Sequence, residues 1–449
     1  MTGVGLRILA WWRKPELRTA ATLGLLAAIE RVVLYRVYAP IEFSDTLAYF
    51  RLAGALATSG LSAYDGTRVP GYPAWVAILG MDPARVWVAQ LVVGWGMTML
   101  LFLLTWQTTR RAGLALLVGG LYSAIPGQFL FESNLLTESL TGFLGLAATV
   151  LVLSLDRIRS PGARAVVALG AGIAASWAGL VRALFFILPA WLFPFVLTSA
   201  GGARRQKTAE AVLFLAPAVL FLGGWLGFIQ RSYGMLAPDT MGGFHLIQHT
   251  GAFFELLPDE QALLRDTYVR YRDERIAERG DQTNTIWDAI PEMSEVSGLG
   301  FYDLSRELQR VSVQLILAHP DKYLASVVDG WISFWKAPVY WDAAQLKGEP
   351  LRTAMGLLAA AGRGVSWIAN GLFLAFVGLA AVSPRIRRFL HVDRVALVIG
   401  GWVGLASLLQ SLPDHGDNPR FLVPLQMLVI FVVARALSFG LRRPTPPVA

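Results

Sequence analysis

The chain has 449 residues, of which 55% are hydrophobic and only 16% are charged. A soluble domain carries roughly 25% charged residues, so this composition excludes an ordinary soluble protein and indicates a chain surrounded largely by lipid. Cysteine is absent, which excludes disulfides, thiolate metal sites and cysteine nucleophiles. The net charge of +8 comes from loops between apolar segments, so it indicates a membrane topology and no nucleic-acid partner.

Apolar segments recur along the whole chain. A membrane-spanning helix needs about 20 mostly apolar residues, and the sequence contains ten such segments. The pattern predicts an all-α integral membrane protein with about ten transmembrane helices in a lipid bilayer. The eighth segment is over-long and contains Arg363, which suggests that its first part lies in the membrane interface. The segments cover residues 19–38, 86–106, 112–131, 136–155, 164–181, 183–200, 211–230, 354–382, 394–412 and 421–438.

The basic residues indicate how these helices are oriented. Lys and Arg are enriched in short loops on the cytoplasmic side of a membrane. With ten spans, the short basic loops all fall on the side of the N-terminus, which predicts a multi-pass protein of the plasma (inner) membrane with both termini in the cytoplasm. No cleavable signal is evident, because the first segment lacks a small-residue cleavage site. The basic residues are Arg7, Arg13, Lys14, Arg18, Arg110, Arg111, Arg157, Arg159, Arg164, Arg204, Arg205, Lys207, Arg385, Arg387, Arg388, Arg442 and Arg443.

The remaining segments fall on the opposite, extracytoplasmic side. We divide the chain into a first transmembrane half at 1–230, which includes an extracytoplasmic loop at 39–85, a large extracytoplasmic region at 231–353, and C-terminal transmembrane helices at 354–449. The large region ends in "DKYLASVVDGWISFWKAPVYW", where apolar residues recur at helical spacing. This segment is expected to form a helix that lies on the membrane surface.

The first extracytoplasmic loop carries an acid and a base in a short stretch. In "FSDTLAYF", Ser44 is suited to cap a helix, and Asp45 then either complements the helix dipole or serves a site at the membrane surface. Arg68 precedes the rigid turn "VPGYPAW", in which Tyr72 suits the membrane interface. The turn is either a structural anchor or a device that aims Arg68 as an anion clamp, which its forked guanidinium suits.

Three further charged residues lie at the outer ends of predicted spans. "FESNLLTESLTGF" carries Glu132 and Glu138, and Glu138 lies about one turn inside the fourth span. A carboxylate on a spanning helix is costly, so it usually faces a cavity or a charged partner. Arg182 lies between two apolar helices on the side where arginines are rare, so it either snorkels to the interface or meets a phosphate.

The last outer loop, "PDHGDNPRF", packs Asp414, His415, Asp417 and Arg420 between two spans. His415 is able to donate a hydrogen bond or to change its charge near neutral pH. A metal site built from Asp414, His415 and Asp417 is conceivable, but local spacing alone is weak support for it. Together these residues concentrate carboxylates, arginines and a histidine on the extracytoplasmic face, which indicates an active site there.

Six short motifs then occur in a family-like order: "SDTLAYFRLA", "RVPGYP", "LLTESL", "LVRALFFILPAWL", "HPDKYL" and "DNPRFLVPLQML". On these motifs the chain resembles the polytopic GT-C glycosyltransferases, and within them the branch of the protein O-mannosyltransferases and aminoarabinose transferases. The resemblance spans most of the chain, although each motif is loose. It implies a GT-C-like arrangement of transmembrane helices, extracytoplasmic loops and interfacial helices.

The resemblance also implies an activity. The donor would be a sugar carried on a polyprenyl phosphate, and the acceptor a cell-envelope glycan, a glycolipid or a protein on the periplasmic or exterior side. Asp45 would be the catalytic base of an inverting transfer, and Arg68 would lie near the donor phosphate. Glu138 and Arg182 also match recurring positions of the family. Asp45 is followed by Thr46 and not by the second acid that is common at this position of the family.

Elementary chemistry agrees with these roles. Inverting transfer needs a base near the acceptor hydroxyl and positive charge near the leaving phosphate. Arg68, Arg182 and Arg420 would hold that phosphate, with Tyr72, Glu138 and His415 as further substrate-binding residues. No cofactor is required, and a divalent cation remains an open alternative. No Asp-x-Asp motif or glycine-rich phosphate loop suggests a nucleotide-sugar donor.

Two other classes of protein remain open. A multi-span transporter or flippase of a lipid-linked or anionic substrate is the main alternative, although such proteins usually show internal repeats and ionisable groups near the bilayer midplane. Another enzyme acting on a lipid phosphate is the second. The sequence does not identify the sugar or the acceptor.

Overall fold

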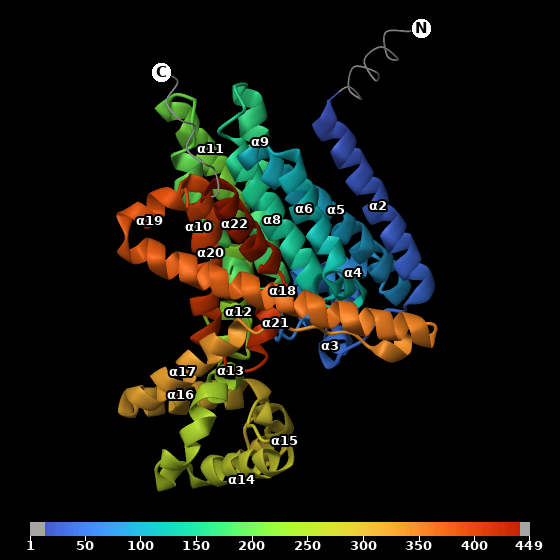
Figure 1. Cartoon of the computed structure of the whole chain (residues 1–449). Coiled ribbons are helices and arrows are strands. Elements are labelled where there is room, and N and C mark those ends of the chain that lie inside the picture. Colours follow the sequence, from blue (N-terminus) through green and yellow to red (C-terminus); the bar gives the residue numbers. More distant parts are fainter. Residues whose placement is uncertain (1–13, 441–449) are drawn as a thin grey trace.

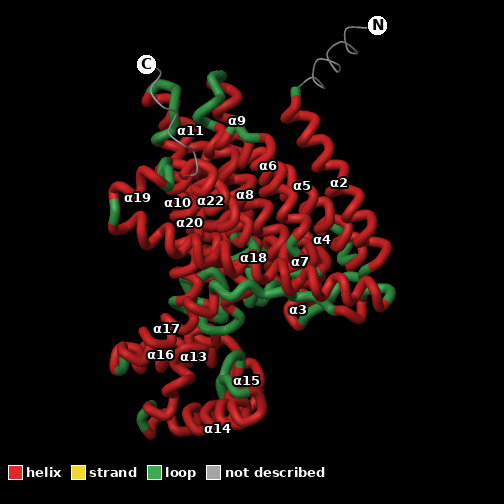
Figure 2. The backbone as a smooth tube through the Cα atoms, in the orientation of Figure 1, coloured by secondary structure: helices red, strands yellow, loops and turns green. Residues whose placement is uncertain are grey.

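The computed structural model describes residues 14–440, and the regular elements in this range are all helical (Figure 2). An isolated parallel bridge joins Ile41 to Asn134, and no longer strand occurs among the described residues. This confirms the predicted all-α fold class. The predicted basic residues Arg7, Arg13, Arg442 and Arg443 lie outside the described range.

The apolar segments form a bundle in which neighbouring helices run side by side (Figure 1). Each predicted segment coincides with one helix or with consecutive helices. Helix α3 lies below the bundle in the view of Figure 1, and the short helix α4 lies beside the lower part of α5. The bundle and its flanking helices are α2 (Pro15–Val37), α3 (Ser44–Ser59), α4 (Gly71–Ile78), α5 (Pro83–Thr109), α6 (Ala112–Ala124), α7 (Pro126–Phe129), α8 (Glu138–Ser154), α9 (Pro161–Val181), α10 (Leu188–Leu197), α11 (Arg204–Pro217), α12 (Gly224–Tyr233), α18 (Glu349–Val382), α19 (Pro384–Phe389), α20 (Arg394–Ser411), α21 (Asn418–Leu422) and α22 (Gln426–Gly440).

By length and composition, five of the described helices are able to cross a membrane, and a sixth candidate is a pair bent by 66° at Ile125. Three apolar helices are shorter. Helix α2 falls outside this group because Glu30, Arg31 and Arg36 interrupt its apolar sequence. The count of ten spans therefore stays a prediction. The five are Pro83–Thr109, Pro161–Val181, Arg204–Tyr233, Glu349–Val382 and Arg394–Ser411, and the shorter ones are Glu138–Ser154, Ala183–Leu197 and Gln426–Gly440.

Helix α18 differs from its neighbours in length and direction. It has 34 residues, which corresponds to about 51 Å of helix, whereas the hydrocarbon layer is about 30 Å thick. Figure 1 shows it crossing the bundle obliquely. A strong tilt accommodates an over-long helix. The interfacial position of its first part stays a prediction, and Arg363 lies on the exposed side of the helix.

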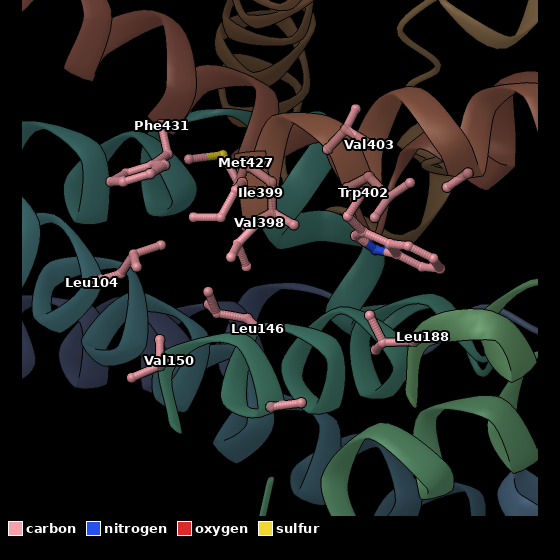
Figure 3. Packing of buried hydrophobic residues seen from close by; sticks show 14 of the residues in the cluster. Leu104, Leu146, Val150, Leu188, Val398, Ile399, Trp402, Val403, Met427 and Phe431 are labelled. Carbon is pink, nitrogen blue, oxygen red and sulfur yellow. The ribbon is translucent and has the colours of Figure 1, made fainter. Parts of the chain in front are cut away.

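Apolar side chains from distant helices close the bundle. Figure 3 shows Leu146 and Val150 of α8 opposite Ile399 and Trp402 of α20, with Met427 of α22 beside them. Ridge-and-groove packing of this kind excludes water and joins the two ends of the chain into one core. The core therefore brings the loop before α21 to the end of the bundle where α8 begins.

The two ends of the bundle differ in character. At one end, arginines of the predicted basic loops donate hydrogen bonds to backbone carbonyls of other segments. Arg111 donates to the Ser438 carbonyl at 2.7 Å, and Arg157 donates to the Gln107 carbonyl at 2.6 Å. Arg164 and Glu210 form a buried two-pronged ion pair at this end. The sequence pattern did not mark Glu210, because its arginine partner is 46 positions away. The described ends of the chain lie on this side as well (Figure 1).

A helical lobe projects from the opposite end (Figure 1). It has a core of its own, which includes Phe244, Phe254 and Leu308. Along α17, Leu324, Val328 and Ile332 are all more than half exposed, so the apolar stripe predicted for the membrane surface stays uncovered by the described residues. The lobe contains α13 (Gly242–Thr250), α14 (Ala262–Arg279), α15 (Thr285–Ser297), α16 (Phe301–Ala318) and α17 (Pro320–Phe334).

The separation of the two ends leads to a topology prediction. A reporter fused after Gln282, in the lobe, should be active as an extracytoplasmic alkaline phosphatase, and a fluorescent-protein fusion after Ser160 should fluoresce in the cytoplasm. The reason is that Lys and Arg in short loops stay on the cytoplasmic side. Exchanging the two reporters between the sites provides the control. If both positions report the same side, the predicted orientation is wrong.

Candidate functional site

The start of α3 places Asp45 at the lobe end of the bundle. The Thr46 hydroxyl accepts a hydrogen bond from the Phe43 amide at 2.9 Å and donates to the Leu135 carbonyl at 3.0 Å. Ser44 is the first helical residue and makes no side-chain cap, so the prediction that Ser44 caps this helix is wrong. Because Thr46 joins α3 to the segment before α8, Asp45 is held near Glu138.

Two arginines hold the Asp45 carboxylate. Arg68 donates to Oδ1 at 2.8 Å and Arg420 donates to Oδ2 at 2.7 Å. Arg68 precedes α4 and Arg420 lies on α21, so the two arginines come from opposite ends of the chain. Charge-assisted hydrogen bonds of this length are the stronger class in proteins. The structure thus unites residues that are 375 positions apart in the chain.

Glu138 lies on the buried side of Asp45 and also accepts hydrogen bonds from two arginines. Arg182 donates to Glu138 Oε1 at 2.8 Å, and Arg420 Nε donates to the same oxygen. The Arg182 guanidinium also lies 3.9 Å from the centre of the Phe421 ring, which adds a cation–π contact. Glu138 Oε2 is buried and has no hydrogen-bond partner among the described residues. We call Asp45, Arg68, Glu138, Arg182 and Arg420 the arginine–carboxylate cluster.

The cluster has an open side and a closed side. The exposed fraction of the side chain is 27% for Arg68 and 24% for Asp45, but it is 0% for Glu138. A ligand that approaches from outside the bundle meets Asp45 and Arg68 first. Three arginines and two carboxylates leave one net positive charge, and this charge favours an anionic ligand.

Asp45 and Arg68 each favour the charged form of the other. Burial favours the neutral acid, but the guanidiniums of Arg68 and Arg420 outweigh it and hold the pKa of Asp45 well below its usual range. Burial lowers the pKa of Arg68, but the charge and the hydrogen bond of Asp45, together with Tyr49 and Asp239, outweigh it and raise that pKa. Without a ligand, Asp45 is therefore ionised and is a weak proton acceptor.

The turn after Arg68 explains how the loop reaches the cluster. Gly71 lies against the end of α9, where a Cβ atom would come within 2.6 Å of the Leu180 carbonyl group. Only glycine permits this approach. Tyr72 is fully buried and donates to Gln90 Oε1 at 2.8 Å, so it does not lie at the membrane interface as the sequence suggested. Its role in substrate binding stays a prediction.

A histidine that the sequence analysis did not single out lies beside the cluster. His245 Nδ1 lies 3.3 Å from Oδ2 of the buried Asp414. One turn earlier, the Met241 sulfur contacts Arg68 Nη1 at 2.6 Å. Burial lowers the pKa of His245, but the Asp414 carboxylate outweighs it and raises that pKa above its usual value. Nothing near His245 in the sequence marks it, because its partner is about 170 residues away.

His415 packs against a second histidine and a serine of α17. Its ring stacks on His249 with 5.5 Å between centres, and Ser326 bridges the two rings at 3.1 Å and 2.9 Å. Burial lowers the pKa of His415, so its neutral form prevails near neutral pH. These contacts belong to the junction with α17, and a substrate contact of His415 stays a prediction.

The conceivable metal site of the last outer loop is not assembled. Asp414 faces His245, whereas Asp417 accepts a hydrogen bond from the Tyr340 hydroxyl at 2.5 Å. Among residues 14–440 no group of three or more histidines and carboxylates is placed to hold a metal ion. Glu132, the other acid of the "FESN" segment, is paired with Arg31 at 2.6 Å deep in the bundle, so it is not part of the cluster.

Comparison with known proteins gives no family for this chain. No protein-family model matches the chain, and no curated protein matches it. One solved structure is similar, the archaeal oligosaccharyltransferase AglB from Archaeoglobus fulgidus in complex with an inhibitory peptide and a dolichol-phosphate. The similarity covers 95% of this chain and 50% of that one, at 15% identity and a TM-score of 0.47. At these values the likeness carries no conclusion about substrate or mechanism.

Proposed function

We propose that the protein is a membrane glycosyltransferase of the GT-C type, which transfers a sugar from a polyprenyl-phosphate donor to an acceptor on the extracytoplasmic face. The observation that carries the proposal is the arginine–carboxylate cluster at the lobe end of the bundle. It combines a carboxylate with two arginines in reach of a ligand, next to apolar helices that suit a lipid tail. The acceptor is a cell-envelope glycan, a glycolipid or a protein.

In this reaction the acceptor oxygen attacks the sugar carbon that is joined to the phosphate. The new bond forms between the acceptor oxygen and that carbon, the bond from the carbon to the phosphate oxygen breaks, and the leaving phosphate keeps the electron pair. Asp45 takes the proton of the acceptor hydroxyl, and Arg68 and Arg420 stabilise the phosphate charge as it develops.

The resting ion pairs imply an order of events. While Asp45 is held by both arginines, it binds a proton poorly. A donor phosphate that takes over Arg68 or Arg420 removes part of that restraint and raises the proton affinity of Asp45. Donor binding would therefore make Asp45 a better proton acceptor before the acceptor hydroxyl reacts. The His245–Asp414 pair, beside Arg68, is a second group suited to accept the proton.

Glu138 and Arg182 have a supporting role in this proposal. Glu138 is fully buried and binds Arg182 and Arg420 from below, so it positions the arginines and does not face the donor directly. A transporter or flippase usually binds its substrate near the bilayer midplane, between internal repeats. The cluster lies at one end of the bundle, which favours the transferase.

The proposal is tested by donor binding to arginine variants. Arg68→Ala should weaken binding of a polyprenyl-phosphate sugar by about 10–100-fold, the loss expected for a hydrogen bond to a charged group. Arg68→Lys should restore it only in part, because Lys lacks the two-pronged geometry. Arg182→Ala should weaken it through Glu138 and Arg420. Titration of the purified variants with the donor provides the measurement.

Arg51→Ala is the matched control, because Arg51 is an arginine of the same loop region that is paired with Asp65 and is 60% exposed. It should bind the donor like the parent protein. Unchanged affinity in both Arg68→Ala and Arg182→Ala would remove the phosphate role of the cluster, and with it the proposed donor class.

A further inference from the structure

A cavity of about 320 Å³ lies between α18, α20 and α22. Its walls are mostly apolar and include Phe373, Phe376, Leu397, Phe431 and Val432. Water in such a space would find few hydrogen-bond partners, so a hydrocarbon chain is the better occupant.

Glycines on α20 create the space. Gly400, Gly401 and Gly404 line the cavity, and a Cβ atom added at Gly404 would meet no other atom within 4 Å. Glycine inside a helix costs about 1 kcal/mol relative to alanine. Trp191 fills the space beside Gly401, whereas the space beside Gly404 stays open and forms part of the groove.

One end of the cavity is basic. Arg435 lines it and is 95% buried, with 5% of its surface exposed. Asp393 accepts from Arg435 Nη2 at 2.6 Å, but Arg435 Nε is buried and has no hydrogen-bond partner among the described residues. Arg387 lines the same cavity and is exposed. An anionic oxygen at this place would satisfy the unused donor and balance the excess of positive charge over Asp393.

The cavity is distinct from the arginine–carboxylate cluster. Its basic end lies near the start of α20, at Val392 and Ala396, whereas the loop that carries Arg420 follows the end of α20. The 18 residues of α20 separate the two places, which is about 27 Å of helix. The cavity thus belongs to the end of the bundle that holds the basic loops, where anionic lipids are found on the cytoplasmic side of membranes.

We propose that this cavity binds an anionic phospholipid, with an acyl chain between α18, α20 and α22 and the phosphate at Arg387 and Arg435. The charge of the headgroup complements the two arginines, and the apolar walls complement the chain. The site is independent of the proposed transferase function, because it uses none of the residues of the arginine–carboxylate cluster.

The experiment uses the full-length protein, purified in detergent and titrated with phosphatidylglycerol or with phosphatidylcholine of the same acyl chains. Native mass spectrometry counts the bound lipid. Phosphatidylglycerol should bind at least about tenfold more tightly, the difference expected for a charge-assisted hydrogen bond. Gly404→Leu fills the cavity and should lower that binding by about tenfold or more. Arg387→Gln should remove most of the preference for the anionic lipid.

Gly378→Leu is the matched control. Gly378 lies on α18, does not line the cavity, and a Cβ atom there also meets nothing within 4 Å. This variant should bind phosphatidylglycerol like the parent protein. Arg387→Gln keeps the test decisive if Gly404→Leu does not fold, because Arg387 is an exposed residue. Equal binding of the two phospholipids would overturn the proposal, and so would an unchanged preference for phosphatidylglycerol in Arg387→Gln.

Discussion

Replacing Asp45 with Asn should slow sugar transfer by about 10²–10⁴-fold at saturating donor, the usual loss when general-base catalysis is removed. Asn keeps the size of the side chain and can still accept a hydrogen bond from Arg68 or Arg420, but it cannot take a proton. The measurement is single-turnover transfer with a purified variant that is shown to be folded and to bind the donor.

The control for this prediction is Asp65→Asn. Asp65 also carries an ion pair with an arginine, at 2.6 Å from Arg51, but it lies outside the arginine–carboxylate cluster and should turn over normally. If Asp45 only complements the dipole of α3, Asp45→Asn would cost about 0.3–1 kcal/mol of stability and leave the rate near that of the parent. A rate within about threefold of the parent would reject Asp45 as the base. The proton acceptor would then be sought at His245, because Glu138 is enclosed by its arginines.

Replacing Glu138 with Leu should destabilise the folded protein by about 3–5 kcal/mol, the loss typical of removing one partner of a buried ion pair. Arg182 would lose its carboxylate while its side chain is only 9% exposed. Arg420 would keep Asp45 but lose its second partner. Leu has a similar volume and avoids a large cavity, so the loss reports the uncompensated charge. Denaturant unfolding of the purified protein in detergent measures the effect.

Glu274→Leu is the matched control for this change. Glu274 faces Arg270 at 3.6 Å on the surface of α14, and both side chains are about half exposed. A surface ion pair of this kind contributes little to the free energy of unfolding, so the variant's free energy of unfolding should lie within about 0.5 kcal/mol of the parent's. If Glu138→Leu unfolds like this control, the arginine–carboxylate cluster does not stabilise the fold, and a positioning role of Glu138 would lose its physical basis.

Much of the helical framework is predictable from local sequence. Long apolar segments form helices in lipid because their backbone groups must be satisfied within the segment, and each predicted segment indeed coincides with helical structure. Boundaries depend on finer interactions. Ser44 illustrates this, because the cap was expected from its hydroxyl, whereas Thr46 makes the contact and binds the Leu135 carbonyl as well.

The candidate site was predictable in its members but not in its geometry. Glu138 and Arg182 were marked by a costly charge at the end of an apolar segment, whereas Asp45, Arg68 and Arg420 were marked as charged residues in loops between such segments. The pairing among them follows from the packing of α3, α8, α9 and α21, which no local pattern encodes.

His245 and Tyr72 show what the sequence did not indicate. An aspartate about 170 positions away is what makes His245 noteworthy, and the backbone of α9 is what encloses the turn that holds Tyr72. By itself the sequence determined that the chain is helical, apolar and asymmetric in charge, because these properties depend on composition and on residues close in the chain. Only the tertiary structure decided which acid meets which arginine, because ion pairs between loops depend on how distant helices pack.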